Sequence, residues 1–182
     1  MSMSLDGYVA GPEGELDWMM RTRSPEGIDW VEQALWQAGA HLMGRRTYAS
    51  MVEYWPTSTD PLAAPMNAIP KIVFSRSGSL AHEPTTAPAP GWDKTRFLGS
   101  DLAADIAALK AESGKDLLAH GGASFAQALV RLGLVDEYRL VVHPVVLGSG
   151  RALFDGTAPF DLTLTDATTF STGTQGLIYR PK

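Results

Sequence analysis

The sequence contains no cysteine, no long apolar run and no excess of basic residues. The absence of cysteine excludes disulfide bridges, thiolate metal sites and a cysteine nucleophile. No apolar stretch approaches the roughly 20 residues that a membrane-spanning helix needs. The start of the chain also lacks the basic segment and the apolar core of a signal peptide. We therefore expect a cytoplasmic protein that does not bind a membrane.

The charge balance argues against nucleic acid as a partner. The chain of 182 residues carries 15 Lys and Arg against 20 Asp and Glu, a net charge of −5, whereas nucleic-acid-binding proteins usually present a broad basic face. Because 45% of the residues are hydrophobic and 19% are charged, we expect one folded domain that spans residues 1–182. An anionic ligand would then have to be held by a local basic cluster.

Hydrophobic periodicity predicts alternating strands and helices through the middle of the chain. Strands are expected at residues 40–43, 71–76 and 117–120, and helices at 25–38, 48–55, 100–112 and 124–132. This alternation predicts a mainly parallel sheet with right-handed crossovers. The prolines in residues 57–70 predict a loop there.

The two ends of the chain predict further strands. Residues 1–10 and 137–146 are expected to be strands, and residues 162–169 and 174–179 a hairpin. The predicted fold class is therefore α/β: a three-layer α/β/α domain with a mostly parallel central sheet and a C-terminal antiparallel hairpin.

The first candidate anion site follows the strand at residues 40–43. Gly44 lets a ligand approach the backbone, and the free amides of the helix that follows favour a phosphate. Arg45 and Arg46 could add forked, charge-assisted contacts, and Thr47 could donate its hydroxyl. The alternative is a surface arginine pair beside an ordinary helix start.

Two more strand ends resemble the first. Ser75 and Arg76 lie at the carboxyl end of the strand at residues 71–76, at the edge of the sheet where ligands bind in open α/β folds. Gly121 and Gly122 follow the next strand and lead into a helix, which again presents amides to an anion. Each pattern alone is also typical of a polar turn or of a helix start that needs small residues.

A serine hydrolase is a rival reading of the same segment. Ser124 lies in a Gly-x-Ser-x-Ala sequence, and Asp136 and His143 follow it in the chain order of a hydrolase triad. Elsewhere, Asp6 in an Asp-Gly turn and Asp29 near a helix start are candidate acids, although turn formation and helix capping explain them equally well. The four histidines lack close spacing, so no metal is expected.

These segments occur in an order that resembles the dihydrofolate reductase-like superfamily, in the branch of the reductase (RibD C-terminal) domain of riboflavin biosynthesis. The resemblance is carried by Ser-Leu-Asp-Gly-Tyr-Val-Ala, Leu-Met-Gly-Arg-Arg-Thr-Tyr, Lys-Ile-Val-Phe-Ser-Arg, His-Gly-Gly-Ala-Ser-Phe and the segment from Val135 to Phe154. It covers nearly the whole chain. It implies an NADPH-dependent oxidoreductase, similar to 5-amino-6-(5-phosphoribosylamino)uracil reductase or to dihydrofolate reductase, and a homodimer.

The resemblance also implies roles for particular residues. Cofactor contacts are expected from Val9, Ala10, Gly44, Arg45, Arg46, Thr47, Ser75, Arg76, Gly121, Gly122, Ala123, Ser124 and Phe125. It further implies a cis peptide between Gly121 and Gly122, and a mobile loop at residues 11–20. Substrate contacts are expected from Met51, Leu147 and Gly148. Apart from the resemblance, the two candidate acids Asp6 and Asp29 are expected to have catalytic roles, in substrate binding or proton relay.

One position departs from the pattern of dihydrofolate reductases. Counting back from Gly44 without a gap places Ile28, not Asp29, where those enzymes carry their acidic residue, and one residue turns a helical side chain by about 100°. A small heterocyclic or ribosylaminopyrimidine-like substrate is therefore expected in place of dihydrofolate. The serine hydrolase and a catalytically silent NADPH-binding module remain the alternatives.

Overall fold

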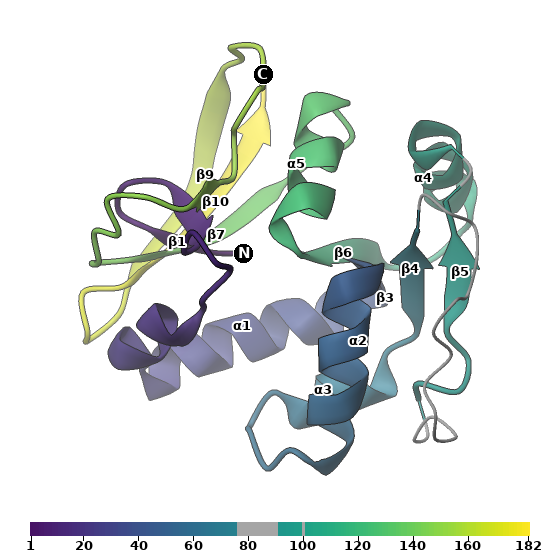
Figure 1. The fold of residues 1–182 in the computed structure, drawn as a ribbon, viewed down its shortest axis with the longest axis horizontal. Coiled ribbons are helices and arrows are strands. Elements are labelled where there is room, and N and C mark those ends of the chain that lie inside the picture. The colour runs from purple at the N-terminus through teal and green to yellow at the C-terminus, as the bar shows by residue number, and fades with distance from the viewer. Residues whose placement is uncertain (76–90, 100) are drawn as a thin grey trace. The chain divides into compact units, whose positions relative to one another are not determined.

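The structure is a computed structural model that describes residues 1–75, 91–99 and 101–182. It is an α/β fold, as predicted, and is drawn in Figure 1. The chain forms two compact units, one made of Met1–Trp30 with Ala126–Lys182 and the other of Val31–Phe125. The single domain over residues 1–182 stays a prediction.

The Val31–Phe125 unit contains a parallel sheet of four strands in the order β5-β4-β3-β6. The strands are β3 (Ala38–Gly44), β4 (Lys71–Phe74), β5 (Arg96–Leu98) and β6 (Asp116–Gly121). Because the strands are parallel, the carboxyl ends of the neighbours β3 and β6 lie at the same edge.

Helical segments cover both faces of this sheet. The segments of this unit are α2 (Arg45–Tyr54), η2 (Trp55–Thr57), α3 (Ala63–Ala68) and α4 (Leu102–Ala111). On one face, Met43 and Val73 form a buried cluster with Tyr48 and Trp92. On the other, Phe125, near the start of α5 (Ala123–Arg131), stacks on Phe74 with ring centroids 5.1 Å apart. Helix, sheet and helix thus form three layers.

Two polar side chains of this unit, His41 and Lys71, are fully buried. Lys71 is fully buried, and its Nζ donates to the carbonyl oxygens of Asn67 at 2.8 Å and Gly91 at 3.0 Å. His41 is its cross-strand partner and is also fully buried. Its ring packs edge-on against His120, with centroids 4.4 Å apart. Burial, and then the charge of Lys71, lowers the pKa of His41 to about 4.

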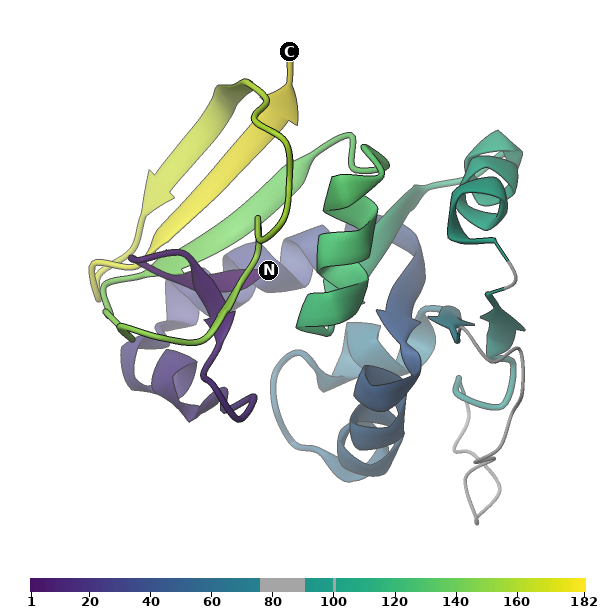
Figure 2. The same ribbon diagram turned by 45° about the horizontal axis from the view of Figure 1, so that its top comes forward.

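The other unit is built on a second sheet of four strands, in the order β1-β7-β10-β9. These are β1 (Ser2–Ser4), β7 (Tyr138–His143), β10 (Gln175–Pro181) and β9 (Leu162–Thr169). Strand β1 runs parallel to β7, whereas β9 and β10 form the predicted antiparallel hairpin, green to yellow in Figure 2. The unit also holds the strand pair β2 (Tyr8–Ala10) and β8 (Arg151–Ala152), and η1 (Asp17–Thr22). Helix α1 (Pro25–Gln37) begins in it.

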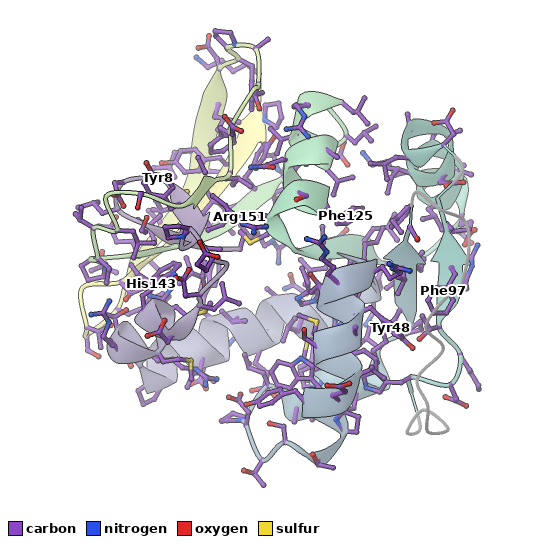
Figure 3. All side chains as sticks on the ribbon, viewed as in Figure 1. Tyr8, Tyr48, Phe97, Phe125, His143 and Arg151 are labelled. Atoms are coloured by element: carbon purple, nitrogen blue, oxygen red, sulfur yellow. The ribbon has the colours of Figure 1, made fainter. Side chains whose placement is uncertain are left out.

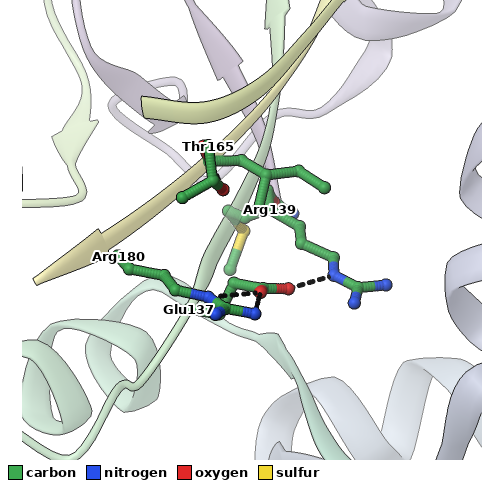
Figure 4. A network of polar contacts seen from close by, with 6 residues as sticks. Glu137, Arg139, Thr165 and Arg180 are labelled. Carbon is green, nitrogen blue, oxygen red and sulfur yellow. Dashed lines mark hydrogen bonds and ion pairs between the residues drawn. The ribbon is translucent and has the colours of Figure 1, made fainter. Parts of the chain in front are cut away.

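An ion-pair network fastens β10 to the start of β7. The carboxylate of Glu137 accepts from Arg139 Nε at 2.6 Å and from Arg180 at 2.9 and 3.0 Å (Figure 4). The bonds from Arg180 therefore link the end of β10 to the start of β7. Within the described ranges, none of the helices combines the length and apolar character needed to cross a lipid bilayer.

Several predicted boundaries are wrong. Helix α3 lies where a loop was predicted, and the predicted strand at residues 1–10 is two strands, β1 and β2, separated by a turn. The long strand predicted at residues 137–146 ends at His143, because Pro144 has no amide to continue the ladder. Ser100, the first residue of the helix predicted at residues 100–112, lies outside the described residues. Asp101 caps α4 by accepting from the amides of Ala103 and Ala104.

Candidate functional site

Most of the residues predicted to hold a cofactor lie at two junctions in the Val31–Phe125 unit. Strand β3 ends at Gly44 and α2 begins at Arg45, while β6 ends at Gly121 and α5 begins at Ala123. No side chain caps the start of α2, so its first amides are available to a ligand. The two helix starts follow neighbouring parallel strands, which is where such a fold binds anions.

The backbone at these junctions is closely packed. A Cβ atom added to Gly122 would lie 3.0 Å from Thr47 Oγ1, and one added to Gly44 would lie 3.4 Å from the Cβ of Phe125. The peptide between Gly121 and Gly122 is cis, as expected from the resemblance. A larger residue at Gly122 would therefore push against the side chain that marks the start of α2.

Charged side chains are available beside this backbone. Arg45 and Arg46 are exposed, and neither guanidinium forms an ion pair within the described part of the chain. Ser75 follows β4 at the same edge, and its amide donates to the carbonyl of Leu98 at 3.0 Å. Arg76 lies outside the described residues.

Met51 and Ser124 differ in their burial. Met51 is half-buried and packs against the cluster of Met43, Tyr48, Val73 and Trp92. In the same unit, the rings of Tyr48 and Phe97 meet edge-on with centroids 5.4 Å apart; both side chains are labelled in Figure 3. Ser124, in contrast, is exposed in the first turn of α5.

In the unit made of Met1–Trp30 with Ala126–Lys182, Asp6 contacts two predicted substrate residues, Leu147 and Gly148. Its carboxylate accepts from the amides of Gly148 at 2.8 Å and Leu147 at 3.2 Å, and from the hydroxyl of the buried Ser4 at 2.7 Å. The hydrogen bond from Ser4, and then those from Gly148 and Leu147, lowers the pKa of Asp6 below its ordinary value. The carboxylate is therefore ionised at neutral pH.

Val9 and Ala10 are buried in the same unit, in β2. Strand β2 pairs antiparallel with β8, with Tyr8 opposite Ala152 and Ala10 opposite Arg151; the side chains of Tyr8 and Arg151 are labelled in Figure 3. The remaining predicted acid, Asp29, is exposed on α1.

His143 does not have the partner that a hydrolase triad requires. Its Nδ1 shares a hydrogen bond of 2.7 Å with the hydroxyl of Thr22, whereas a triad histidine binds a carboxylate there. The ring also packs edge-on against Trp18, which is 3% exposed. His143 thus fixes η1 to the sheet.

Sequence reasoning missed two of these residues. Ser4 holds Asp6 from two positions away, and this short spacing is a local signal that could have identified it. Thr22 could not be found in this way, because its partner His143 is 121 positions away. Among the residues that the structure describes, no three His, Asp or Glu side chains are grouped as a metal ion would require; the absence of a metal stays a prediction.

Comparisons with known proteins support the resemblance. The family model for the RibD C-terminal domain matches residues 1–176. The protein YyaP of Bacillus subtilis strain 168, itself uncharacterized, is 31% identical over 98% of this chain and 91% of its own. A candidate riboflavin biosynthesis protein from Shewanella sp. PV-4 has a similar structure, with a TM-score of 0.78 and 24% identity over 100% of this chain and 96% of its own. Dihydrofolate reductase from Enterococcus faecalis, solved with NADP(H), has a TM-score of 0.62 and 14% identity over 100% of this chain and 93% of its own.

Proposed function

The chain belongs to the RibD C-terminal domain family, and we propose that it is an NADPH-dependent reductase of a small heterocyclic or ribosylaminopyrimidine-like substrate. The observation that carries this proposal is the pair of glycine-to-helix junctions after β3 and β6. They present an uncapped helix start, closely approaching backbone and the two exposed arginines, Arg45 and Arg46, to one class of ligand. A phosphorylated nucleotide fits that combination of free amides and positive charge.

The cofactor would be held mainly by the Val31–Phe125 unit. Gly44, Arg45, Arg46 and Thr47 would bind its phosphates from the start of α2. Ser75 and Arg76 would contact the adenosine end. The remaining contacts would come from Gly121, Gly122, Ala123, Ser124 and Phe125, and from Val9 and Ala10. When bound, the cofactor supplies the hydride, while the protein orients the reactants and excludes water.

The substrate half of the proposal assigns Met51, Leu147 and Gly148 as contacts. Of the two predicted acids, Asp29 is exposed on α1. We propose Asp29 as the proton donor. Asp6 already accepts from Ser4, Leu147 and Gly148, so it has no proton to transfer at neutral pH.

A homodimer is part of the proposal. Leu5 is 66% exposed and Val146 is 69% exposed, and the two lie close together because the Leu5 amide donates to the carbonyl of Val145 at 2.8 Å. Phe160 and Leu164 are also exposed, near and within β9. Apolar side chains at such exposure favour burial against a second copy.

Calorimetric titration with NADPH and with NADH tests the cofactor assignment. The wild type should prefer NADPH, and Arg45→Ala or Arg46→Ala should each weaken its binding about ten- to a hundredfold, the cost of losing a charged hydrogen bond. Arg131→Ala removes the same charge from the last turn of α5 and serves as the matched control. Unchanged affinity in both Arg45→Ala and Arg46→Ala would overturn the phosphate assignment.

A substrate panel separates the reductase from a silent binding module. NADPH oxidation is followed by absorbance with 5-amino-6-(5-phosphoribosylamino)uracil, dihydrofolate and related heterocycles. The reductase predicts turnover with at least one aminopyrimidine. Tight NADPH binding without oxidation by any member of the panel would support the silent module.

A further inference from the structure

The Asp6 carboxylate accepts hydrogen bonds from three residues, one in β1 and two in the loop that follows β7. Its two carboxylate oxygens accept from the Ser4 hydroxyl, from the Gly148 amide and, shared between them, from the Leu147 amide. The Ser4 hydroxyl is itself fixed, because it also accepts from the Tyr8 amide at 3.0 Å. The carboxylate is thus held on one side by β1 and β2 and on the other by residues 147 and 148.

The surrounding backbone aligns the whole loop with the start of the chain. The Leu5 amide donates to Val145, and the Leu153 amide donates to the carbonyl of Gly7 at 3.3 Å. Farther along, β2 pairs with β8, and a Cβ atom on Gly150 would clash with the carbonyl oxygen of Ala10. Residues 145–153 therefore run alongside residues 5–10, with their two ends fixed by backbone contacts.

The Asp6 side chain holds the middle of this loop. Its carboxylate accepts hydrogen bonds from the backbone amides of Leu147 and Gly148. Gly148 has a φ of +74°, and nothing lies within 4 Å of the position where a Cβ atom would stand. Without the carboxylate, the Leu147 and Gly148 amides would lose the acceptor that Asp6 provides.

We propose that Asp6 is a positioning residue whose carboxylate sets the conformation of the Leu147–Gly148 segment and so shapes the substrate pocket, and that it transfers no proton. This inference rests on the proposed function, because it takes that segment as part of the substrate pocket. It changes the role of Asp6 from acid to acceptor.

The two roles predict opposite behaviour of an asparagine variant. In Asp6→Asn, the side-chain oxygen can still accept from the Leu147 and Gly148 amides, while the amide group donates to the Ser4 hydroxyl. The loop is then retained although no titratable group remains. Asp6→Ala removes both the acceptor and the acid, and Asp161→Ala removes an exposed carboxylate of the same unit as a control.

Amide hydrogen exchange, resolved at Leu147 and Gly148, tests the structural half on the NADPH-loaded protein. We expect exchange at both amides to accelerate about tenfold or more in Asp6→Ala and to stay near the wild-type rate in Asp6→Asn and Asp161→Ala. Unchanged exchange in Asp6→Ala would overturn the proposal, as would equal acceleration in Asp6→Asn.

Steady-state kinetics with the best substrate of the panel tests the functional half. Positioning predicts that Asp6→Ala raises KM more than it lowers kcat and that Asp6→Asn restores most of the loss. Loss of kcat in Asp6→Asn as complete as in Asp6→Ala would identify a proton transfer and overturn the proposal. Failure of the wild type to bind NADPH would refute the proposed function instead, and the exchange rates would still decide whether Asp6 holds the loop.

Discussion

The hydroxyl of Thr22 lies 2.7 Å from Nδ1 of His143 and joins η1 to the end of β7. The carbonyl of Thr22 in turn accepts from the hydroxyls of Thr172 at 2.8 Å and Thr174 at 3.1 Å. Because Trp18 is buried against the same histidine, the second half of the segment predicted to be a mobile loop is fastened to the sheet. Movement, if it accompanies ligand binding, is then expected in residues 11–16.

Replacing Thr22 should destabilise this unit. Thr22→Val keeps the shape of the side chain but leaves His143 Nδ1 without its partner in a buried site, which costs about 1–3 kcal/mol. Thr172→Val is the control, because Thr174 still satisfies the Thr22 carbonyl. Urea unfolding measures both. A loss in Thr22→Val no larger than in Thr172→Val would show that the hydroxyl contributes little.

Ser124 should not react as a hydrolase nucleophile. The Nδ1 of His143 is bound to a hydroxyl in place of the carboxylate that orients a triad histidine. We therefore expect no covalent labelling of Ser124 by a fluorophosphonate, read by mass spectrometry of the intact chain, with a known serine hydrolase as positive control. Labelling that Ser124→Ala abolishes would restore the hydrolase reading.

Gly122→Ala should weaken NADPH binding and lower stability, because the new methyl group would lie 3.0 Å from Thr47 Oγ1. Overpacking of this kind costs about 1–3 kcal/mol. Gly114→Ala is the matched control, since nothing lies within 4 Å of its Cβ position.

Thr47→Ala removes Oγ1, the atom that the new methyl group would contact. It therefore tests whether this contact causes the loss of stability. The double variant Gly122→Ala with Thr47→Ala should recover part of the stability lost in Gly122→Ala alone. A double-mutant cycle from thermal and urea unfolding measures that coupling. Simple additivity of the two substitutions would mean that the contact with Thr47 is not responsible.

Stability should fall as the pH drops from about 6.5 to about 4, the range over which burial lowers the pKa of His41. The unfolded chain binds a proton in this range and the folded chain does not, so protonation favours unfolding. The full shift of His41 corresponds to about 3 kcal/mol. Burial and the neighbouring His41 also lower the pKa of His120, so it acts in the same direction.

His41→Leu tests this assignment because it removes one titrating group from a buried position. The variant should lose less stability than the wild type between pH 6.5 and 4, as measured by urea unfolding at successive pH values. Some dependence should persist, since the pKa values of His120 and His143 are lowered too. Identical pH profiles would assign the loss to other groups.

Local sequence signals predicted the elements whose ends are set by neighbouring residues. Ser24 and Pro25 predicted the start of α1, and the Ser24 hydroxyl does accept from the Gly27 amide at 3.2 Å. The alternation in residues 162–169 predicted β9 with its exact bounds. Threonine and other β-branched residues fit a strand regardless of what lies across from them.

Helix α3 was missed because its prolines were taken as breakers. Pro65 lies in the first turn of this helix, where its missing amide has no intrahelical partner to lose. The helix predicted at residues 25–38 ends at Gln37, and Gly39 lies inside β3. A Cβ atom there would come within 3.3 Å of the Lys115 backbone, so a larger side chain would crowd this close approach.

The candidate site likewise contains features that could be predicted from neighbouring residues and features that could not. The junctions at Gly44 and Gly121 could be predicted because a strand end, a glycine and a helix start adjoin in sequence. The partners of Asp6 could not, because Leu147 lies 141 positions away and offers only its backbone amide. A backbone donor leaves no trace in residue type.

This chain has no cysteine, and Lys71 links two of its segments by hydrogen bonds where a disulfide cannot form. Its side chain ties position 67 to position 91 through two carbonyl oxygens. Burial lowers the pKa of Lys71 to about 8, yet a neutral amine keeps two N–H groups, one for each carbonyl. This staple can therefore survive both a reducing environment and the loss of its own charge.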